Sequence, residues 1–386
     1  MPKIYQLLVF LSTSGMMWGV MATPISLFDY NLPPELIAQE PIEPRDQSRL
    51  LVLERGVKGD KGGLRGIEHC RFFEILDYLH AGDVLVFNNT KVFKARLCGR
   101  VGDKELEVFL LPPLPDHYEM ERGEGSKSND GVCIWSALIK PGRKVQTGDK
   151  IDLGGLVAEV FEKHEDGTVD LKFSVLKEEV LKFTDEHGGI PIPPYVKKVP
   201  DQLSTYQTVY AREIGSVAAP TAGFHFTKDL LEKVKEKGIR VEFVTLHVGL
   251  GTFRPVKTET LEEHKMHSEF VEIKSEVAKR LNAAKFDGRR IIAVGTTTTR
   301  ALEGAAAANG GELSENGFLG EVNLFIMPGF KFRVINSLIT NFHLPKSTLL
   351  VLISALAGRE NVLRAYEEAV KEGYRFYSFG DAMLLL

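Results

Sequence analysis

The sequence predicts an α/β protein, in which a main α/β domain carries an inserted small all-β barrel. In the C-terminal half, β-branched apolar runs alternate with helical patterns, as in α/β folds. Between residues 90 and 180, five or six short strands are separated by turn signals, as in a small barrel or sandwich. The chain has 386 residues, 44% hydrophobic and 26% charged, which suits two or three globular domains.

Residues 1–24 form an N-terminal extension that we exclude from the fold. Lys3 precedes an apolar run at 4–11, and residues 20–22 resemble a signal-peptidase site. This apolar run is too short to span a membrane as a helix. The alternative is a mis-assigned start codon, with Met17 or Met21 as the true first residue; we prefer it because the body looks cytosolic.

The α/β domain is expected in two parts, residues 25–89 and 181–386. In the first part, Pro34 opens a short helix, and a strand at 50–53, a helix at 72–79 and a strand at 83–87 follow. Arg45 and Arg49 precede the first strand. Residue type alone does not distinguish surface ion pairing from one wall of a site for these two arginines.

The inserted barrel is expected over residues 90–180. Its predicted strands are 92–97, 105–111, 132–139, 150–161 and 168–175, with a polar insertion near 112–130. Residues 188–195 are rich in glycine and proline and form a stiff connector back to the main domain.

The second part of the α/β domain contains most of the expected site. Its predicted helices are 228–237, 275–286, 300–308, 349–357 and 360–372. Its predicted strands are 240–246, 268–273, 290–294, 321–327 and 334–338, and the chain ends in an apolar strand or core segment at 376–386.

Two loops rich in small residues, 218–227 and 245–254, flank the helix at 228–237. Each contains one histidine, His225 or His247, among glycines and threonines. Glycine allows close backbone approach to a ligand, and histidine is readily tuned for proton transfer. Three further histidines lie in similar loops of this domain: His264, His267 and His343. The pattern favours proton transfer and polar substrate contacts over core or surface histidines.

A glycine and four threonines, residues 295–299, link a predicted strand to a predicted helix. A strand, a Gly/Thr turn and a helix can bind anions or hydroxyl-rich ligands at the helix N-terminus. Simple capping requires only one threonine, so the run of four favours a site.

A metal centre is the less favoured interpretation of the histidines. His264 and His267 are three residues apart with Glu269 beyond, but no HExxH helix is present. The three cysteines, Cys70, Cys98 and Cys133, are scattered, and we expect them to be reduced. The net charge of −4 argues against binding nucleic acid by bulk charge, although a local basic groove stays possible.

The motifs of the body resemble those of the S-adenosylmethionine:tRNA ribosyltransferase-isomerase family of queuosine biosynthesis. Several long motifs occur in the right order from about residue 27 to 386, so the resemblance is specific. The N-terminal extension and the insertion near 113–130 depart from the family pattern. The matching segments are 28–30, 83–90, 206–227, 245–256, 264–269, 294–300, 324–329, 338–350 and 379–383.

The resemblance implies transfer and isomerisation of the ribosyl part of S-adenosylmethionine. The acceptor is the aminomethyl group of 7-aminomethyl-7-deazaguanine at the tRNA wobble position, the product is epoxyqueuosine, and adenine and methionine leave. No cofactor beyond this co-substrate and no metal is expected. A cytoplasmic monomer without membrane contact is expected. The family fold, an α/β domain carrying a β-barrel, agrees with the insertion predicted above.

Combined with the residues, the resemblance suggests roles within the site. His225 or His247 is expected to act as general base or acid, and His267 with Glu269 to position the ribose or amine. Thr296, Thr297 and Thr298 are expected to hold the methionine end or a phosphate. The other expected substrate contacts are Asn88, Asn89, Thr221, Gly223, Gly249, Gly251, Thr252, Arg254, Arg300, Asn341 and His343.

The RNA is expected along a local basic surface of the barrel formed by Lys91, Lys94, Arg96 and Lys140. These side chains fit a solvated barrel face equally well. Two alternatives from other classes stay open at this point: a metal-dependent hydrolase that uses the histidines, and a non-catalytic tRNA-binding protein.

Overall fold

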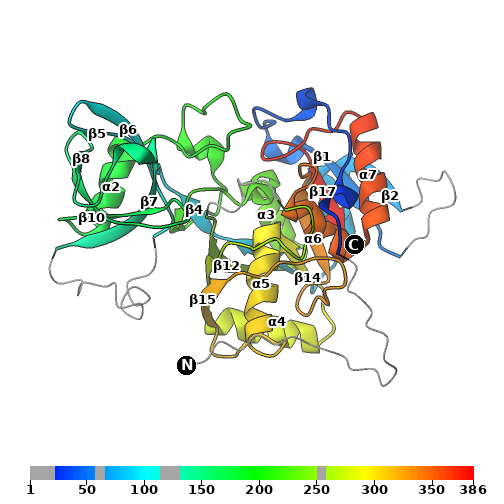
Figure 1. The fold of residues 1–386 in the computed structure, drawn as a ribbon. Coiled ribbons are helices and arrows are strands. Elements are labelled where there is room, and N and C mark those ends of the chain that lie inside the picture. Colours follow the sequence, from blue (N-terminus) through cyan, green and yellow to red (C-terminus); the bar gives the residue numbers. More distant parts are fainter. Residues whose placement is uncertain (1–21, 57–65, 114–130, 250–257) are drawn as a thin grey trace, which may run out of the picture.

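The computed structural model describes residues 22–56, 66–113, 131–249 and 258–386. They form a main α/β body and a β-barrel that lies to one side of it (Figure 1). The predicted fold class is therefore confirmed. Within the described ranges, no helix combines the length and apolar character needed to cross a lipid bilayer.

A nine-stranded sheet forms the centre of the main body. Its neighbouring strands β12, β3, β14 and β16 are mutually parallel, so their carboxyl ends meet at one edge. The strand order is β15 (Phe318–Val322), β13 (Glu269–Ile273), β12 (Arg240–His247), β3 (Val84–Asn88), β14 (Ile291–Val294), β16 (Ser337–Asn341), β17 (Ala382–Leu385), β1 (Arg49–Leu53) and β2 (Ile67–Arg71).

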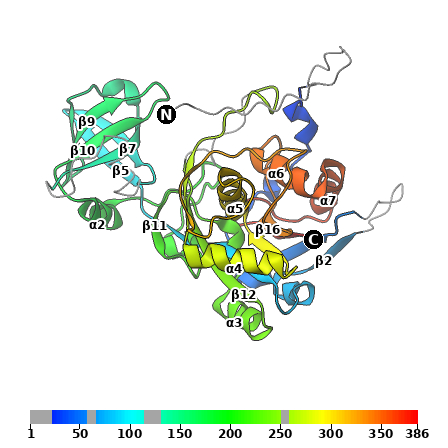
Figure 2. The same cartoon turned by 90° about the horizontal axis from the view of Figure 1, so that it is seen from below.

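Both faces of this sheet are covered, which explains its continuous apolar strands. In β3, Val84 and Val86 face one core, whereas Leu85 and Phe87 face the other. Helices α4 (Ser275–Phe286), α5 (Thr296–Ala308), α6 (Thr348–Ala357) and α7 (Arg359–Lys371) contribute to the first core. The 3-10 helix η4 (Phe72–Tyr78) and helix α3 (Lys228–Glu236) contribute to the second (Figure 2).

The inserted barrel is closed and entirely antiparallel, as its alternating strands predict. Helix α2 (Lys177–His187), which the sequence did not predict, packs on the barrel core through Val180. We therefore place the end of this unit after α2 and not at residue 180. The barrel strands are β5 (Arg96–Val101), β6 (Lys104–Leu110), β7 (Cys133–Lys140), β8 (Lys150–Asp152), β9 (Val157–Lys163) and β10 (Val169–Phe173).

A small parallel pair, β4 (Thr90–Val92) and β11 (Glu213–Ser216), joins the two bodies. The remaining 3-10 helices are short and mostly begin beside proline. They are η1 (Ile25–Phe28), η2 (Pro34–Leu36), η3 (Arg45–Gln47), η5 (Gly142–Lys144), η6 (Leu203–Tyr206) and η7 (Thr221–His225).

Several predicted boundaries are wrong at places that bear on the site. Helix α5 begins at Thr296 and not at residue 300, because the threonines form its first turn. Strand β15 ends at Val322, so the strand predicted at 321–327 is mostly loop, and β16 lies three residues later than predicted. The helix predicted at 72–79 is present as a 3-10 helix at Phe72–Tyr78.

Candidate active site

A cavity of about 550 Å³, counted to its open mouth, lies at the sheet edge where the parallel strands end. Ligands of open α/β sheets bind at this edge. β14 leads into Gly295 and α5, and β16 leads into Asn341 and His343. The lining residues are Tyr195, Tyr206, Ala218, Ala219, Pro220, Thr221, Ala222, Val248, Gly295, Thr296, Thr297, Thr340, Asn341, Phe342, His343, Leu349, Tyr377 and Ser378.

The N-terminus of α5 borders this cavity without a side-chain cap or an acidic residue in its first turn. Gly295 has a φ of 94°, a value that glycine adopts readily, and so turns the chain from β14 into the helix. The free N–H groups and the helix dipole favour an anion here. Thr296 and Thr297, two of the predicted substrate contacts, line the cavity.

Thr298 does not line the cavity. It is fully buried, and its hydroxyl donates to the backbone oxygen of Val294 at 2.7 Å. This hydroxyl is therefore used inside the helix, and we leave Thr298 out of the proposed site.

Asn341 connects the cavity to His225. Its side-chain nitrogen lies 3.1 Å from Nε2 of His225, and its oxygen accepts from the Thr221 hydroxyl at 3.2 Å. Ser48 Oγ lies 2.7 Å from Nδ1 of the same ring, which stacks on Phe72 at 4.9 Å. With both nitrogens bonded and 4% exposure, His225 supports the cavity wall from behind and is not part of the lining.

Burial keeps His225 neutral. It lowers the pKa of the imidazole to about 3, and the nearby cations Arg375 and Arg45 act in the same direction. The neutral ring accepts from Asn341 at Nε2 and donates from Nδ1 to the Ser48 oxygen.

His343 is the histidine that lines the cavity. Its Nε2 lies 2.9 Å from the Thr340 hydroxyl, and no described residue bonds Nδ1. Its backbone is fixed by two tyrosines, because its N–H donates to Tyr366 and its carbonyl accepts from Tyr30. Burial lowers the pKa of this imidazole to about 3, so the ring is neutral at pH 7.

His247 ends β12 beside the cavity but outside its lining. Its Nδ1 lies 2.8 Å from the Thr90 hydroxyl, and its ring lies against Gly215, where a Cβ would approach within 2.8 Å. Burial lowers its pKa to about 4, and the positive charge of Lys177 in α2 adds to this. No described residue bonds Nε2, so this nitrogen is available for a proton.

Glu269 is paired with Arg300 and not with His267. The two side chains form an ion pair between β13 and α5, with exposures of 2% for Glu269 and 8% for Arg300. Oε1 of Glu269 and Nη2 of Arg300 are buried without a hydrogen-bond partner in the described structure. His267 is exposed, so the predicted action of His267 together with Glu269 is not supported.

Asn88 is a buried side chain that hydrogen-bonds to the backbone at the same edge of the sheet. It is fully buried, and its amide accepts from the backbone N–H groups of Leu246 and Thr90 and donates to the Leu246 carbonyl. Its nitrogen also lies 3.4 Å from the Thr297 hydroxyl. Asn88 thereby fixes β12 relative to the first turn of α5.

Some predicted contacts lie elsewhere. Asn89 lines a separate cavity near Tyr210 and Arg280. Gly223 is required for packing, because a Cβ there would approach the Tyr210 hydroxyl to 1.8 Å. Gly249 is half-buried and outside the lining. Gly251, Thr252 and Arg254 lie outside the described residues.

An aromatic corner that the sequence did not indicate completes the cavity. Tyr195 and Tyr377 meet edge to face with ring centroids 4.0 Å apart, and the Tyr195 hydroxyl lies 2.5 Å from Ser378 Oγ. Tyr377 has a φ of 74°, which is unusual for a non-glycine residue. Its N–H donates to the Phe342 carbonyl and its own carbonyl accepts from Gly380, so tertiary contacts maintain this strained backbone.

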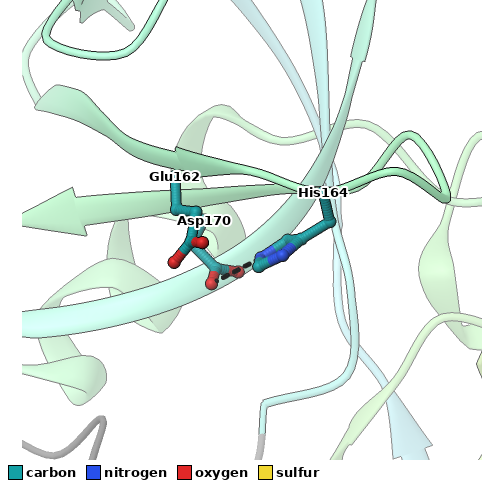
Figure 3. A group of neighbouring side chains, drawn as sticks. All are labelled: Glu162, His164 and Asp170. Carbon is teal, nitrogen blue, oxygen red and sulfur yellow. Dashed lines mark hydrogen bonds and ion pairs between the residues drawn. The ribbon is translucent and has the colours of Figure 1, made fainter.

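The described residues bring potential metal ligands together in one place, on the barrel and not at the cavity (Figure 3). His164 Nε2 lies 2.8 Å from Asp170, whose other oxygen accepts from Ser136 at 2.6 Å, and Glu162 is nearby and exposed. Because His164 is already hydrogen-bonded to Asp170, which raises the pKa of its imidazole, this pair accounts for the group without a metal. The expected absence of a metal stays a prediction.

The predicted basic surface of the barrel is partly neutralised. Arg96 pairs with Glu107 at 2.7 Å, and Lys94 lies 3.8 Å from the Asp185 carboxylate. Lys91 and Lys140 have no acidic partner among the described residues. Two of the four cations are therefore compensated, which weakens the case for this surface as the RNA contact.

Two comparisons place the chain among known proteins. Residues 25–385 match the family model described as "Queuosine biosynthesis protein". The chain is also similar to the crystal structure of an S-adenosylmethionine tRNA ribosyltransferase from Thermotoga maritima. The two share 38% identity, with coverage of 94% of this chain and 100% of that one, and a TM-score of 0.52.

Proposed function

This chain belongs to the queuosine biosynthesis protein family, and we propose that it is an S-adenosylmethionine:tRNA ribosyltransferase-isomerase. It transfers the ribosyl group of S-adenosylmethionine to the aminomethyl group of 7-aminomethyl-7-deazaguanine at the wobble position of tRNA. The ribosyl group isomerises to an epoxycyclopentanediol, giving epoxyqueuosine, and adenine and methionine leave.

The whole-length likeness to the Thermotoga enzyme carries this proposal. The cavity supports it, because it lies where α/β proteins bind ligands and combines a helix N-terminus with an aromatic corner. None of the described lining residues is acidic or basic apart from the neutral His343. A sulfonium in such a cavity relies on aromatic faces and oxygen dipoles for electrostatic stabilisation.

In the proposed binding mode, the methionine carboxylate accepts hydrogen bonds at the N-terminus of α5 near Thr296 and Thr297. The sulfonium then lies toward the ring faces of Tyr195 and Tyr377. The side-chain nitrogen of Asn341 donates to His225 and to the Asp381 carbonyl, so its oxygen accepts hydrogen bonds from the ribose hydroxyls.

Proton transfer begins the proposed reaction. The sulfonium acidifies the C5′ hydrogens, a neutral histidine removes one of them, and adenine takes up a proton as it leaves. His343 is our first candidate for the base because it lines the cavity with Nδ1 unbonded. His247 is the second, with Nε2 unbonded beside the cavity. His225 is a positioning residue in this scheme, since both its nitrogens are bonded.

Product analysis tests the proposed function. The purified chain is incubated with S-adenosylmethionine and precursor-bearing tRNA, and the nucleosides of the digested tRNA are identified by mass spectrometry. The proposal requires the mass of epoxyqueuosine to replace that of the precursor. An unchanged precursor under conditions in which the protein binds both substrates would leave a binding protein as the better description. The monomeric state and the absence of further cofactors stay predictions.

A further inference from the structure

A second, smaller cavity adjoins the proposed active site. It has a volume of about 220 Å³, counted to its mouth, and Arg45, Ser48, His225, Arg375 and Ser378 contribute to its walls. Ser378 also lines the larger cavity, and the bond from Asn341 to His225 connects the two. This volume includes open solvent at the mouth, so the cavity is a shallow recess that can contact one chemical group of a larger ligand.

Arg375 is a cation without an acidic side-chain partner in the described structure. Its guanidinium donates only to backbone carbonyls, those of Glu40 at 3.0 Å and Phe379 at 2.8 Å, and its Nε is buried without a partner. Burial lowers the pKa of Arg375 and the negative charge of Asp381 acts to raise it, but the two oxygens of this carboxylate accept from the backbone N–H groups of Arg49 and Arg375. A half-buried guanidinium with a buried N–H group that lacks an acceptor indicates a binding site for an anion.

Arg45 brings a second guanidinium to the same cavity. It lies over the Phe224 ring at 4.9 Å and donates to the carbonyls of Thr205 and Gln207. Its ion pair with Glu43 is weak because Glu43 is 67% exposed. The positive charges of both arginines lower the pKa of His225, so both guanidinium groups lie near the imidazole ring of this histidine. The carbonyl contacts hold both guanidiniums in place before any ligand binds.

We infer that this cavity binds a phosphodiester group of the RNA next to the reacting nucleotide; the inference rests on the proposed function. Guanidinium groups match phosphate geometry, and the Ser48 and Ser378 hydroxyls add further hydrogen-bonding groups. In the proposed binding mode, the co-substrate carboxylate binds at the N-terminus of α5 and not in this smaller cavity. Because Lys94 and Arg96 are compensated on the barrel, Arg45 and Arg375 are better suited to bind a phosphate near the site.

The salt dependence of tRNA binding tests this inference. We compare the wild type, Arg375→Gln and Arg375→Lys, and use Arg240→Gln as a matched control. Arg240 is exposed at the start of β12, at the opposite end of this strand from the site. Loss of one phosphate contact should reduce the slope of log affinity against log salt by about 0.7 to 0.9 and weaken tRNA binding about tenfold.

The expected pattern is a reduced slope in Arg375→Gln, a retained slope in Arg375→Lys and Arg240→Gln, and unchanged S-adenosylmethionine affinity in all variants. Loss of S-adenosylmethionine affinity in Arg375→Gln with normal tRNA binding would assign the anion to the co-substrate and overturn the inference. A folded Arg375→Gln variant with wild-type affinities for both would overturn it as well. Failure of the wild type to bind tRNA would instead contradict the proposed function.

Inorganic phosphate provides an independent probe of the cavity. At constant ionic strength, phosphate in place of chloride should raise the melting temperature of the wild type and of Arg375→Lys, but not that of Arg375→Gln. An equal rise in Arg375→Gln would place the anion site elsewhere in the molecule. This measurement requires neither RNA nor turnover, and it still applies if Arg375→Gln is less stable than the wild type.

Discussion

Asn341 donates its side-chain amide to Nε2 of His225, 3.1 Å away, and so links the end of β16 to the 3-10 helix η7. Because Ser48 occupies Nδ1, the ring has no nitrogen left for a substrate. His225 lies in a loop that the sequence predicted to form the site. In the structure it fixes the orientation of Asn341, which lines the cavity. In the proposed mechanism, another residue therefore carries out the proton transfer.

His343 is expected to matter for chemistry more than for binding. His343→Gln should slow single-turnover adenine release by about 10² to 10⁴, the usual contribution of a general base, with a smaller effect on S-adenosylmethionine affinity. His247→Gln is the companion variant, because His247 also has an unbonded nitrogen. Near-normal single-turnover rates in both variants would refute histidine as the base.

Buried neutral histidines should make the protein sensitive to acid. The pKa of His343 is about 3 in the folded protein, against an ordinary value of 6.5, so the unfolded chain binds the extra proton between these pH values. Stability should therefore decrease as the pH falls below 6.5. The loss for this one group is about 2 kcal/mol between pH 7 and pH 5.

The measurement is urea unfolding of the wild type and His343→Asn at pH 7 and pH 5. The wild type should lose about 2 kcal/mol more than the variant over this interval. Equal losses in the two proteins would mean that His343 can be protonated in the folded state, contrary to its burial of 95%.

The Glu269–Arg300 pair should be strongly coupled. Glu269→Gln removes the partner of a buried guanidinium and should lower the free energy of unfolding by about 3 to 5 kcal/mol. Adding Arg300→Met removes the unpaired charge, so the double variant should recover much of that loss. Urea unfolding of the two single variants and the double variant measures the coupling. Additive losses would show that the two side chains act independently.

Tyr377 is expected to favour the charged sulfonium over a neutral thioether. Tyr377→Leu should weaken S-adenosylmethionine binding two- to thirtyfold through lost cation–π stabilisation and affect uncharged S-adenosylhomocysteine less. Tyr377→Phe keeps the ring and should keep the preference. Phe286→Leu, at a 93% exposed position, is the control for loss of an aromatic ring. Equal weakening for the two ligands in calorimetric titrations would mean that the ring only packs.

The sequence predicted the features that depend on local pattern. The apolar runs of β3 and β14 and the alternation of the barrel strands are local, and both were confirmed. Thr221, Thr296, Thr297, Asn341 and His343 were predicted as site residues and line one cavity, because loops at the ends of parallel strands meet at one edge.

Long-range partners could not be predicted from the sequence. Glu269 is two residues from His267 in the chain but pairs with Arg300, which packing of α5 brings to it. Tyr195 and Tyr377 are in segments far apart in the chain, and the left-handed backbone of Tyr377 depends on tertiary hydrogen bonds. Neither residue has a local pattern that distinguishes it from a core tyrosine. The proximity of Arg45 and Arg375 was also not predictable, because the two residues are far apart in the sequence and only the fold brings them to one cavity.

Release of adenine tests the central claim most directly. S-adenosylmethionine labelled in its adenine is mixed with excess protein and tRNA that carries 7-aminomethyl-7-deazaguanine, and with otherwise identical tRNA that carries guanine. The account predicts one adenine released for each precursor nucleotide consumed and none with the guanine tRNA. Absence of adenine with the precursor tRNA, or equal release with both tRNAs, would contradict it.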